Sequence, residues 1–382
     1  MEKNYTALGL MSGTSMDGVD ASIIRSDGNR EYSIKLNKYF EYGKKLRQKL
    51  INLRAKILIA DDLETNSLAI GEIEREITLF HANAVNEILD TSKIKIDLIG
   101  FHGQTIFHNS KKKMTKQLGD GKLLSQLTKK LVVFDFRQND LKNGGLGAPL
   151  TPIFHNAMTN KHFNKELNES HFVNIINIGG IANITQTIKW EDFFNSKINK
   201  IRAYDISPGN CLIDEWVRKN SNNKFDKDGH LASLGKTDDL ILNQALENFN
   251  IEPPYNDSLD VNDFDISFAK GLTLEDGAST LTDFTASLIA KGLSYSQSET
   301  KGKKFWIVCG GGRKNKYLLK AIESFEKVVL YPSEKYEIDG DFVESQAFAY
   351  LAIRSFLKLP ISFPTTTGCK EPTIGGIIVK NF

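Results

Sequence analysis

The sequence has few cysteines, almost no net charge and no long hydrophobic run. Its three cysteines stand far apart in the 382 residues, so they predict neither a disulfide framework nor a metal site, and they are typical of a reducing compartment. No apolar run approaches the ~18 residues that a membrane helix needs. The chain also starts with Met-Glu-Lys-Asn-Tyr, which is no secretory signal, so we expect a cytoplasmic protein with no membrane partner.

The charges of the chain nearly cancel. The 49 Lys and Arg residues against 47 Asp and Glu residues give a net charge of +2, which offers no electrostatic basis for binding nucleic acid. The composition, 40% hydrophobic and 25% charged, is that of an ordinary globular protein. At about 150 residues per domain, the length predicts two or three lobes.

One stretch near the N-terminus, residues 7–20, has the pattern of a strand, a polar turn and a second strand. An apolar strand ending near Leu10 and a β-branched strand over 19–24 enclose a turn rich in Ser, Thr and Gly. Successive backbone N–H groups in such a turn form a site for an anion such as phosphate, and Asp17 or Asp20 could hold a divalent cation beside it. The Gly-Lys-Ser/Thr triplet of a Walker loop is missing. A plain hairpin turn is the alternative interpretation.

A second strand–glycine turn–strand pattern opens the other half of the chain. Strands over 171–178 and 181–188 enclose Gly179 and Gly180, with Asn177 just before them. Two such hairpins suggest a duplicated α/β fold with a nucleotide between two lobes. The glycine-rich break before Pro149 places the lobes at 1–149 and 150–356, with the tail 357–382 joining the first.

Polar groups also follow other predicted strands, where α/β sheets bind ligands. His102, Gln104 and Thr105 follow a strand over 96–101, and Arg137 follows a strand over 131–134. These side chains favour a ligand pocket, although His102 could be a core histidine. Asp205 stands between a strand and a helix. The glycines Gly310, Gly311 and Gly312 suit a flat adenine or ribose, or else only a tight turn.

Taken together, these segments resemble the anhydro-N-acetylmuramic acid kinase family of the sugar kinase, Hsp70 and actin superfamily. The resemblance covers nearly the whole chain in the family's order. The matching segments are Gly9-Leu-Met-Ser-Gly-Thr-Ser-Met-Asp-Gly-Val-Asp20, His102-Gly-Gln-Thr105, Asp135-Phe-Arg137, Gly144-Gly-Leu-Gly-Ala-Pro-Leu150, Asn177-Ile-Gly-Gly-Ile-Ala-Asn183, Asp205 to Asn210, Cys309-Gly-Gly-Gly312 and Glu344 to Leu351. Two segments depart from the family pattern: Ser207 replaces a glycine, and residues 254–263 lack a Lys-Ser-Thr-Gly-Arg-Glu-like sequence.

The resemblance implies a two-lobed actin-like ATPase (ribonuclease H-like) fold and a specific reaction. ATP would phosphorylate the 6-oxygen of 1,6-anhydro-N-acetylmuramic acid while water opens the anhydro bridge, giving N-acetylmuramic acid 6-phosphate in cell-wall recycling. Asp205 matches the catalytic aspartate and would be the general base on that water. The implied cofactors are ATP and Mg²⁺, the latter at Asp17 directly or through water, and the implied assembly is a homodimer.

The other site residues follow from their places in these motifs. Arg137 is the candidate for the lactyl carboxylate, and His102, Gln104 and Thr105 are candidates for sugar contacts. Glu344 either orients the sugar or pairs within the last helix. The residues expected at the nucleotide are Gly13, Thr14, Ser15, Met16, Asp17, Gly18, Val19, Asp20, Asn177, Gly179, Gly180, Gly310, Gly311 and Gly312.

Three alternatives remain open at this point. A kinase of another sugar or anhydrosugar would differ only in pocket detail. A non-catalytic nucleotide-binding module would share the fold but show no sugar-dependent turnover. A hydrolase using Ser12 or Ser15 with His102 is disfavoured, because the chain has no nucleophile-elbow sequence.

Overall fold

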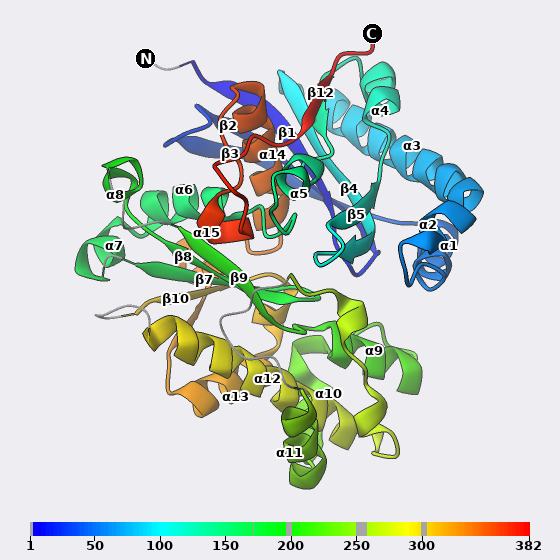
Figure 1. The fold of residues 1–382 in the computed structure, drawn as a ribbon, viewed down its shortest axis with the longest axis vertical. Helices are drawn as coiled ribbons and strands as arrows, with labels where there is room; N and C mark the ends of the chain where they lie inside the picture. The colour runs from blue at the N-terminus through cyan, green and yellow to red at the C-terminus, as the bar shows by residue number, and fades with distance from the viewer. Residues whose placement is uncertain (1–2, 171, 196–200, 250–257, 299–303) are drawn as a thin grey trace. The chain divides into compact units, whose positions relative to one another are not determined.

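The computed structural model describes residues 3–170, 172–195, 201–249, 258–298 and 304–382 (Figure 1). Within them the chain forms two compact units. The first unit comprises Met1–Lys161, Trp190–Ile201 and Phe342–Phe382, and the second comprises His162–Lys189 and Arg202–Asp341. Among the helices of the described ranges, none has the length and apolar character that crossing a membrane requires.

The first unit is built on a seven-stranded mixed sheet in the order β12-β6-β4-β1-β2-β3, with β5 on β4 (Figure 1). The first three strands form an antiparallel meander, and β4 and β6 then run parallel to β1. The C-terminal strand β12 closes the edge antiparallel to β6. The strands are β1 (Tyr5–Ser12), β2 (Gly18–Ser26), β3 (Tyr32–Glu41), β4 (Leu98–Asn109), β5 (Met114–Leu118), β6 (Leu131–Phe134) and β12 (Ile377–Val379).

The two faces of this sheet carry different helices because side chains alternate along a strand. Leu8 and Leu10 of β1 point into a core with α1 (Lys44–Arg54) and α3 (Ser67–Ser92). Gly9, between them, faces α14 (Val343–Phe356) on the other side. The further helices of the unit are α2 (Asp61–Thr65), α4 (Gly121–Thr128), α5 (Gln138–Lys142), α6 (Pro152–His162), α8 (Trp190–Asn195) and α15 (Pro364–Thr367).

The second unit repeats the strand plan of the first. Its five-stranded sheet has the order β11-β10-β7-β8-β9, again an antiparallel meander followed by two parallel strands. β7, β8 and β9 therefore correspond to β1, β2 and β3, and β10 and β11 to β4 and β6. This shared order supports a duplicated architecture. The strands are β7 (Val173–Ile178), β8 (Ala182–Thr187), β9 (Arg202–Ser207), β10 (Trp306–Cys309) and β11 (Leu330–Pro332).

Two helices cover this second sheet. Ile289 and Leu293 of α12 (Leu274–Ser298) and Ile322 of α13 (Lys316–Glu326) pack in one core with strand residues such as Ile176. Another core joins α12 to three more helices through Trp216 and Phe284. These helices are α9 (Cys211–Asn220), α10 (His230–Leu234) and α11 (Asp239–Asn248), and α7 (Asn164–Ser170) completes the unit together with the 3₁₀ turns η1 (Lys227–Gly229), η2 (Val261–Asp263), η3 (Ser267–Ala269), η4 (Gly311–Lys314) and η5 (Ser333–Tyr336).

The α/β class and the two helix-flanked mixed sheets were correctly predicted. The predicted end of the strand at Phe101 was wrong, because β4 continues to Asn109 and pairs with β5, which the sequence analysis missed. The compact units also differ from the predicted lobes: α14 packs on the first sheet, although residues 150–356 were expected to form the second lobe. The reason is the close approach of α14 to Gly9 and Gly100, which periodicity alone does not reveal.

We expect Gly100→Ala to lower the free energy of unfolding by about 2–3 kcal/mol or more, because overpacked cores shift their backbone. A Cβ at this position would lie 2.2 Å from the carbonyl oxygen of Phe348 in α14. The matched control is Gly71→Ala in the exposed part of α3, where a Cβ meets nothing within 4 Å and should stabilise the helix by about 0.5–1 kcal/mol. Urea unfolding measures both, and equal effects would contradict this packing argument.

Candidate functional site

The turn between β1 and β2, residues 13–17, is held from inside the first unit. The Met16 N–H donates to the Gly13 carbonyl at 3.2 Å, and Met16 takes a left-handed φ of 54°. Its side chain is only 2% exposed in the hydrophobic core, whereas Thr14 and Ser15 are exposed. The buried methionine therefore anchors the turn while the hydroxyl-bearing residues face outward.

A buried chain of hydrogen bonds lies beside this turn. The Nδ1 of His81 bonds to the Ile77 carbonyl at 2.8 Å, so Nδ1 carries the proton and Nε2 of the neutral ring accepts. Ser12 Oγ lies 3.4 Å from that Nε2 and 2.7 Å from the Tyr42 hydroxyl. The consistent direction is Tyr42 to Ser12 to His81, which commits the Ser12 hydroxyl inside the protein. Ile77 belongs to the same helix α3 as His81, whereas Ser12 belongs to β1, so the contact with Ser12 depends on the tertiary fold.

Gln104 supports the turn from the neighbouring strand. Its Nε2 donates to the Gly13 carbonyl at 2.9 Å, and the side chain is fully buried. Gln104 thus supports the turn through Nε2, and its predicted sugar contact stays a prediction. Thr105 is half-buried, and its Oγ1 accepts from Gln117 Nε2 at 3.2 Å.

His102, within β4, and Arg137, just after the neighbouring parallel strand β6, are joined by hydrogen bonds. His102 Nδ1 bonds to the Gly103 carbonyl at 2.8 Å, which leaves Nε2 as an acceptor for Arg137 Nε at 3.2 Å and Nη2 at 2.9 Å. The imidazole packs on the Phe348 ring with centroids 4.4 Å apart. Burial, and then the Arg137 charge, hold the pKa of His102 well below its ordinary value. A neutral imidazole thus orients the guanidinium.

In the second unit, the turn between β7 and β8 packs against the segment after β9. The Asn210 N–H donates to the Gly179 carbonyl at 2.8 Å, and the Cys211 N–H to the Gly180 carbonyl at 3.3 Å. Gly209 has φ +55°, and a Cβ there would lie 2.5 Å from the Gly179 carbonyl oxygen. These contacts join two segments that the sequence analysis had placed at the nucleotide and at the catalytic base.

Asp205 lies within β9, opposite Asn183 of β8, and is 6% exposed. Its Oδ2 accepts from Ser258 Oγ at 2.8 Å and from the Leu259 N–H at 2.9 Å. Both partners belong to the stretch that departs from the family pattern. Sequence reasoning missed Ser258 as a partner, since nothing in the sequence links positions 53 residues apart.

The glycines after β10 serve two different purposes. A Cβ on Gly310, at φ +77°, would lie 2.6 Å from the Ile178 carbonyl oxygen, and one on Gly312 would lie 2.2 Å from the Ile178 side chain. Gly311 would meet only Asn210 Nδ2, at 3.9 Å. Tight packing thus accounts for two of these glycines, whereas the third has room above it.

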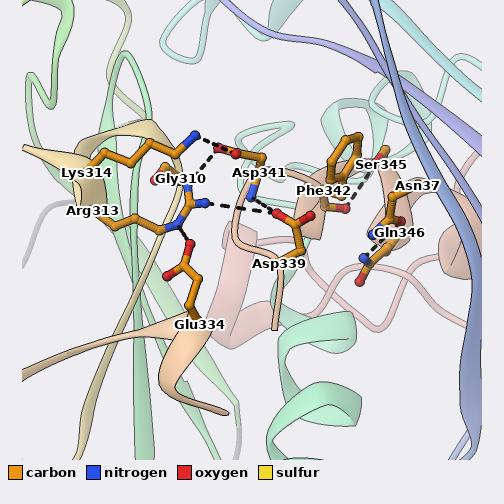
Figure 2. Close-up of polar contacts among 10 residues, drawn as sticks. All are labelled: Asn37, Gly310, Arg313, Lys314, Glu334, Asp339, Asp341, Phe342, Ser345 and Gln346. Carbon is orange, nitrogen blue, oxygen red and sulfur yellow. Dashed lines mark hydrogen bonds and ion pairs between the residues drawn. The ribbon is translucent and has the colours of Figure 1, made fainter. Parts of the chain in front are cut away.

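Arg313 fixes this glycine turn from below (Figure 2). Its Nη1 donates to the Gly310 carbonyl at 2.9 Å and to Asp341 Oδ1 at 2.7 Å, and its Nε donates to Glu334 at 2.5 Å. The side chain is buried, and these hydrogen bonds and carboxylates raise the pKa of the guanidinium against the effect of burial. Lys314 bonds to the other oxygen of Asp341.

Two further predicted site residues, Glu344 and Asp17, lie in α14 and in the turn between β1 and β2. Glu344 is half-buried in the first turn of α14. Asp17 Oδ1 accepts from Ser15 Oγ at 2.6 Å. In the part of the chain that the structure describes, no cluster of three or more His, Cys, Asp or Glu side chains could hold a metal. Magnesium needs only one or two carboxylates when phosphates supply the other ligands, so Asp17 beside the turn fits such an ion.

Comparison with known families shows to which family the chain belongs. The model of a family described as anhydro-N-acetylmuramic acid kinase matches residues 5–381. The chain belongs to the anhydro-N-acetylmuramic acid kinase family. A relative of that name from Pelagibacter ubique is 54% identical over 387 residues and covers 100% of both chains, and one from Brucella canis is 37% identical over 384 residues with 98% of each covered.

Solved structures give weaker likenesses. A ROK family glucokinase from Streptomyces griseus in complex with glucose and AMPPNP has 11% identity and a TM-score of 0.39, covering 91% of this chain and 99% of its own. The activator of the 2-hydroxyisocaproyl-CoA dehydratase from Clostridium difficile has 10% identity and a TM-score of 0.43, covering 92% and 96%. Scores this low carry no argument about the site.

Family membership confirms the resemblance drawn from the motifs and makes the chain a kinase. The actin-like relationship and the roles of the individual site residues stay predictions.

We expect the free energy of unfolding to fall as the pH drops from 7 to 5. Burial lowers the pKa of His81 to about 4 and that of His155 to about 3, whereas an unfolded histidine titrates near 6.5. Between these values the unfolded chain binds more protons, so acid costs stability, by about 1–2 kcal/mol per buried histidine at pH 5. Urea unfolding across this pH range measures the slope.

The variant that tests this dependence is His81→Phe, which should make the slope shallower. The control is His230→Gln, because His230 is exposed and solvent reaches its ring in both states. A slope that is unchanged in His81→Phe would show that this ring titrates alike in the folded and unfolded chain.

Proposed function

We propose that this kinase uses ATP to open the 1,6-anhydro bridge of anhydro-N-acetylmuramic acid and to phosphorylate its 6-oxygen, giving N-acetylmuramic acid 6-phosphate and ADP. The observation that carries the proposal is the 54% identity, over the full length of both chains, to the Pelagibacter ubique relative of that name. The reaction belongs to cell-wall recycling, and we assign it to the cytoplasm and to a homodimer.

Each hairpin turn, taken within its own unit, would offer donors to nucleotide phosphates. Thr14 and Ser15 are exposed at the tip of the first turn and offer hydroxyl and backbone N–H donors. Gly179 and Gly180 of the second turn are half-buried, and Gly311 has room above it for a flat adenine or ribose. Asp17 would hold Mg²⁺ beside the phosphates, and this ion would neutralise the charge that develops on the transferred group.

Asp205 would act as the general base. Water attacks carbon 1 of the sugar and gives its proton to the carboxylate, and the bond from carbon 1 to the 6-oxygen breaks. The 6-oxygen takes the γ-phosphoryl group while the bond from phosphorus to the β-phosphate oxygen breaks and ADP leaves. Ser258 and the Leu259 N–H bind one carboxylate oxygen, which fixes the orientation of the base. General-base catalysis contributes roughly 10²–10⁴-fold.

Arg137 would bind the lactyl carboxylate of the sugar, with Thr105 and Glu344 as further sugar contacts. The acceptor nitrogen of His102 and the Gly147 carbonyl orient the guanidinium. An Arg–carboxylate contact is strengthened by its charge and its fixed geometry. His102 and Gln104 are both buried. His102 would support the sugar site through Arg137, and Gln104 would support the phosphate turn through the Gly13 carbonyl.

The decisive experiment measures ADP release with a panel of sugars, followed by product analysis in oxygen-18 water. We expect turnover with 1,6-anhydro-N-acetylmuramic acid and label at carbon 1 of the product, because water supplies the new hydroxyl. N-acetylmuramic acid, which has no anhydro bridge, is the control for simple phosphorylation. Unlabelled product, or preference for a plain hexose, would refute the proposed reaction.

We expect Asp205→Asn to lose roughly 10²–10⁴-fold in kcat while the Kd for ATP stays within about twofold, because the amide keeps the shape of the side chain but cannot accept the proton. The matched control is Asp226→Asn, a buried carboxylate of the same unit that caps α10 through the Leu231 and Ala232 N–H groups. Near-normal turnover of Asp205→Asn would exclude the general-base role.

A further inference from the structure

Asp140 in α5 is a buried carboxylate to which the sequence analysis gave no role. It is 1% exposed and accepts three hydrogen bonds, two of them from side chains near the C-terminus of the chain. Ser362 Oγ and Thr367 Oγ1 donate to Oδ1 at 2.5 and 2.6 Å, and the Gly147 N–H donates to Oδ2 at 2.8 Å. Three donors aimed at one carboxylate offset the cost of burying it.

The loop that Asp140 holds is braced by the C-terminal segment of the chain. The Leu146 N–H donates to the Thr367 carbonyl at 2.8 Å, and the Lys370 N–H donates to the Asn143 carbonyl at 3.0 Å. A Cβ on Gly145 would lie 2.1 Å from Asp140 Oδ2, so the loop closes directly over the carboxylate. The glycine-rich segment is thus a fixed part of the first unit.

Gly147 connects this carboxylate to the proposed substrate contact. Its N–H binds Asp140, and its carbonyl accepts from Arg137 Nη1 at 2.8 Å. Gly147 has φ +77°, a conformation that glycine adopts freely but does not adopt exclusively. Something must therefore hold its backbone if the carbonyl is to stay aimed at the guanidinium, and the bond to Asp140 does so.

We propose that Asp140 is a positioning residue for substrate recognition: through Gly147 it fixes the orientation in which Arg137 meets the carboxylate of the acidic sugar. This inference rests on the proposed function, in which Arg137 binds that carboxylate. His102 holds Nε and Nη2 of the guanidinium, and the Asp140–Gly147 pair holds Nη1. Together the two supports contact three nitrogens of the guanidinium, which limits its rotation about the long side chain.

The test is a double-mutant cycle on Asp140→Ala and Arg137→Ala, read as KM for the acidic anhydro sugar, KM for a neutral analogue without the lactyl group, and KM for ATP. We expect Arg137→Ala to raise KM for the acidic sugar roughly 10- to 100-fold, and Asp140→Ala to raise it about tenfold, since each loses a charged hydrogen-bonded contact. The double variant should be no worse than Arg137→Ala, because residues that act through one contact are not additive.

Two further variants separate positioning from plain structural damage. Asp140→Asn should recover most of the KM, because its amide oxygen can still accept from the Gly147 N–H while its amino group meets the two hydroxyls. Asp226→Ala, the loss of a buried carboxylate in the other unit, should leave the ratio of acidic to neutral KM unchanged. If Asp140→Ala does not fold, Thr367→Val removes one donor to the carboxylate and should shift the same ratio about two- to fivefold.

The outcomes separate this inference from the proposed function. If Arg137→Ala leaves the ratio of acidic to neutral KM unchanged, the role of Arg137 fails and the inference fails with it. If Arg137→Ala behaves as expected, the inference alone is overturned by any of three results: Asp140→Ala leaves that ratio unchanged, raises the KM for ATP as much as that for the sugar, or adds its full effect to that of Arg137→Ala.

Discussion

The parallel pairing of β1, β4 and β6 is the constraint on which the first half of the candidate site depends. It sets Leu10 opposite Phe101, and Phe101 opposite Phe134, so the residues that follow these three positions lie near one another. The phosphate turn follows β1, His102 follows Phe101, and Arg137 follows β6. Every hydrogen bond described between these groups is a consequence of that register, because a shifted pairing would separate them by several ångströms.

Buried polar groups then specify the details within that frame. Two neutral histidines, His81 and His102, each have one ring nitrogen fixed by a backbone carbonyl, which leaves the other as an acceptor. One accepts from Ser12 near the phosphate turn and the other from Arg137. Since burial keeps both rings uncharged, they orient their partners without adding charge to a site that must bind anions.

In the second unit, ion pairs fix the orientation of the side chains and of the backbone next to them. Figure 2 shows Arg313 between Glu334, Asp339 and Asp341, with Lys314 on the far oxygen of Asp341. A buried arginine that loses one carboxylate is costly, so the network fixes the backbone of the Gly310–Gly312 turn. The chain enters the first unit just beyond Asp341, where Ser345 bonds to the Phe342 carbonyl and Gln346 to Asn37 (Figure 2).

The α/β class, the hairpins with their glycine-rich turns and the family could be predicted from the sequence, because these depend on local patterns: alternation along strands, glycines at turns and motifs in a fixed order. Asp205, Arg137 and the two turns could be proposed as site residues for the same reason. Which side chains contact one another became known from the folded structure alone. Asp140 with Thr367, Asp205 with Ser258 and Ser12 with His81 are joined by folding across long separations, and hydrogen bonds of that kind leave no periodic signal in a single chain. The helix α14 illustrates the same limit, since its place on the first sheet depends on the close approach that Gly9 and Gly100 allow.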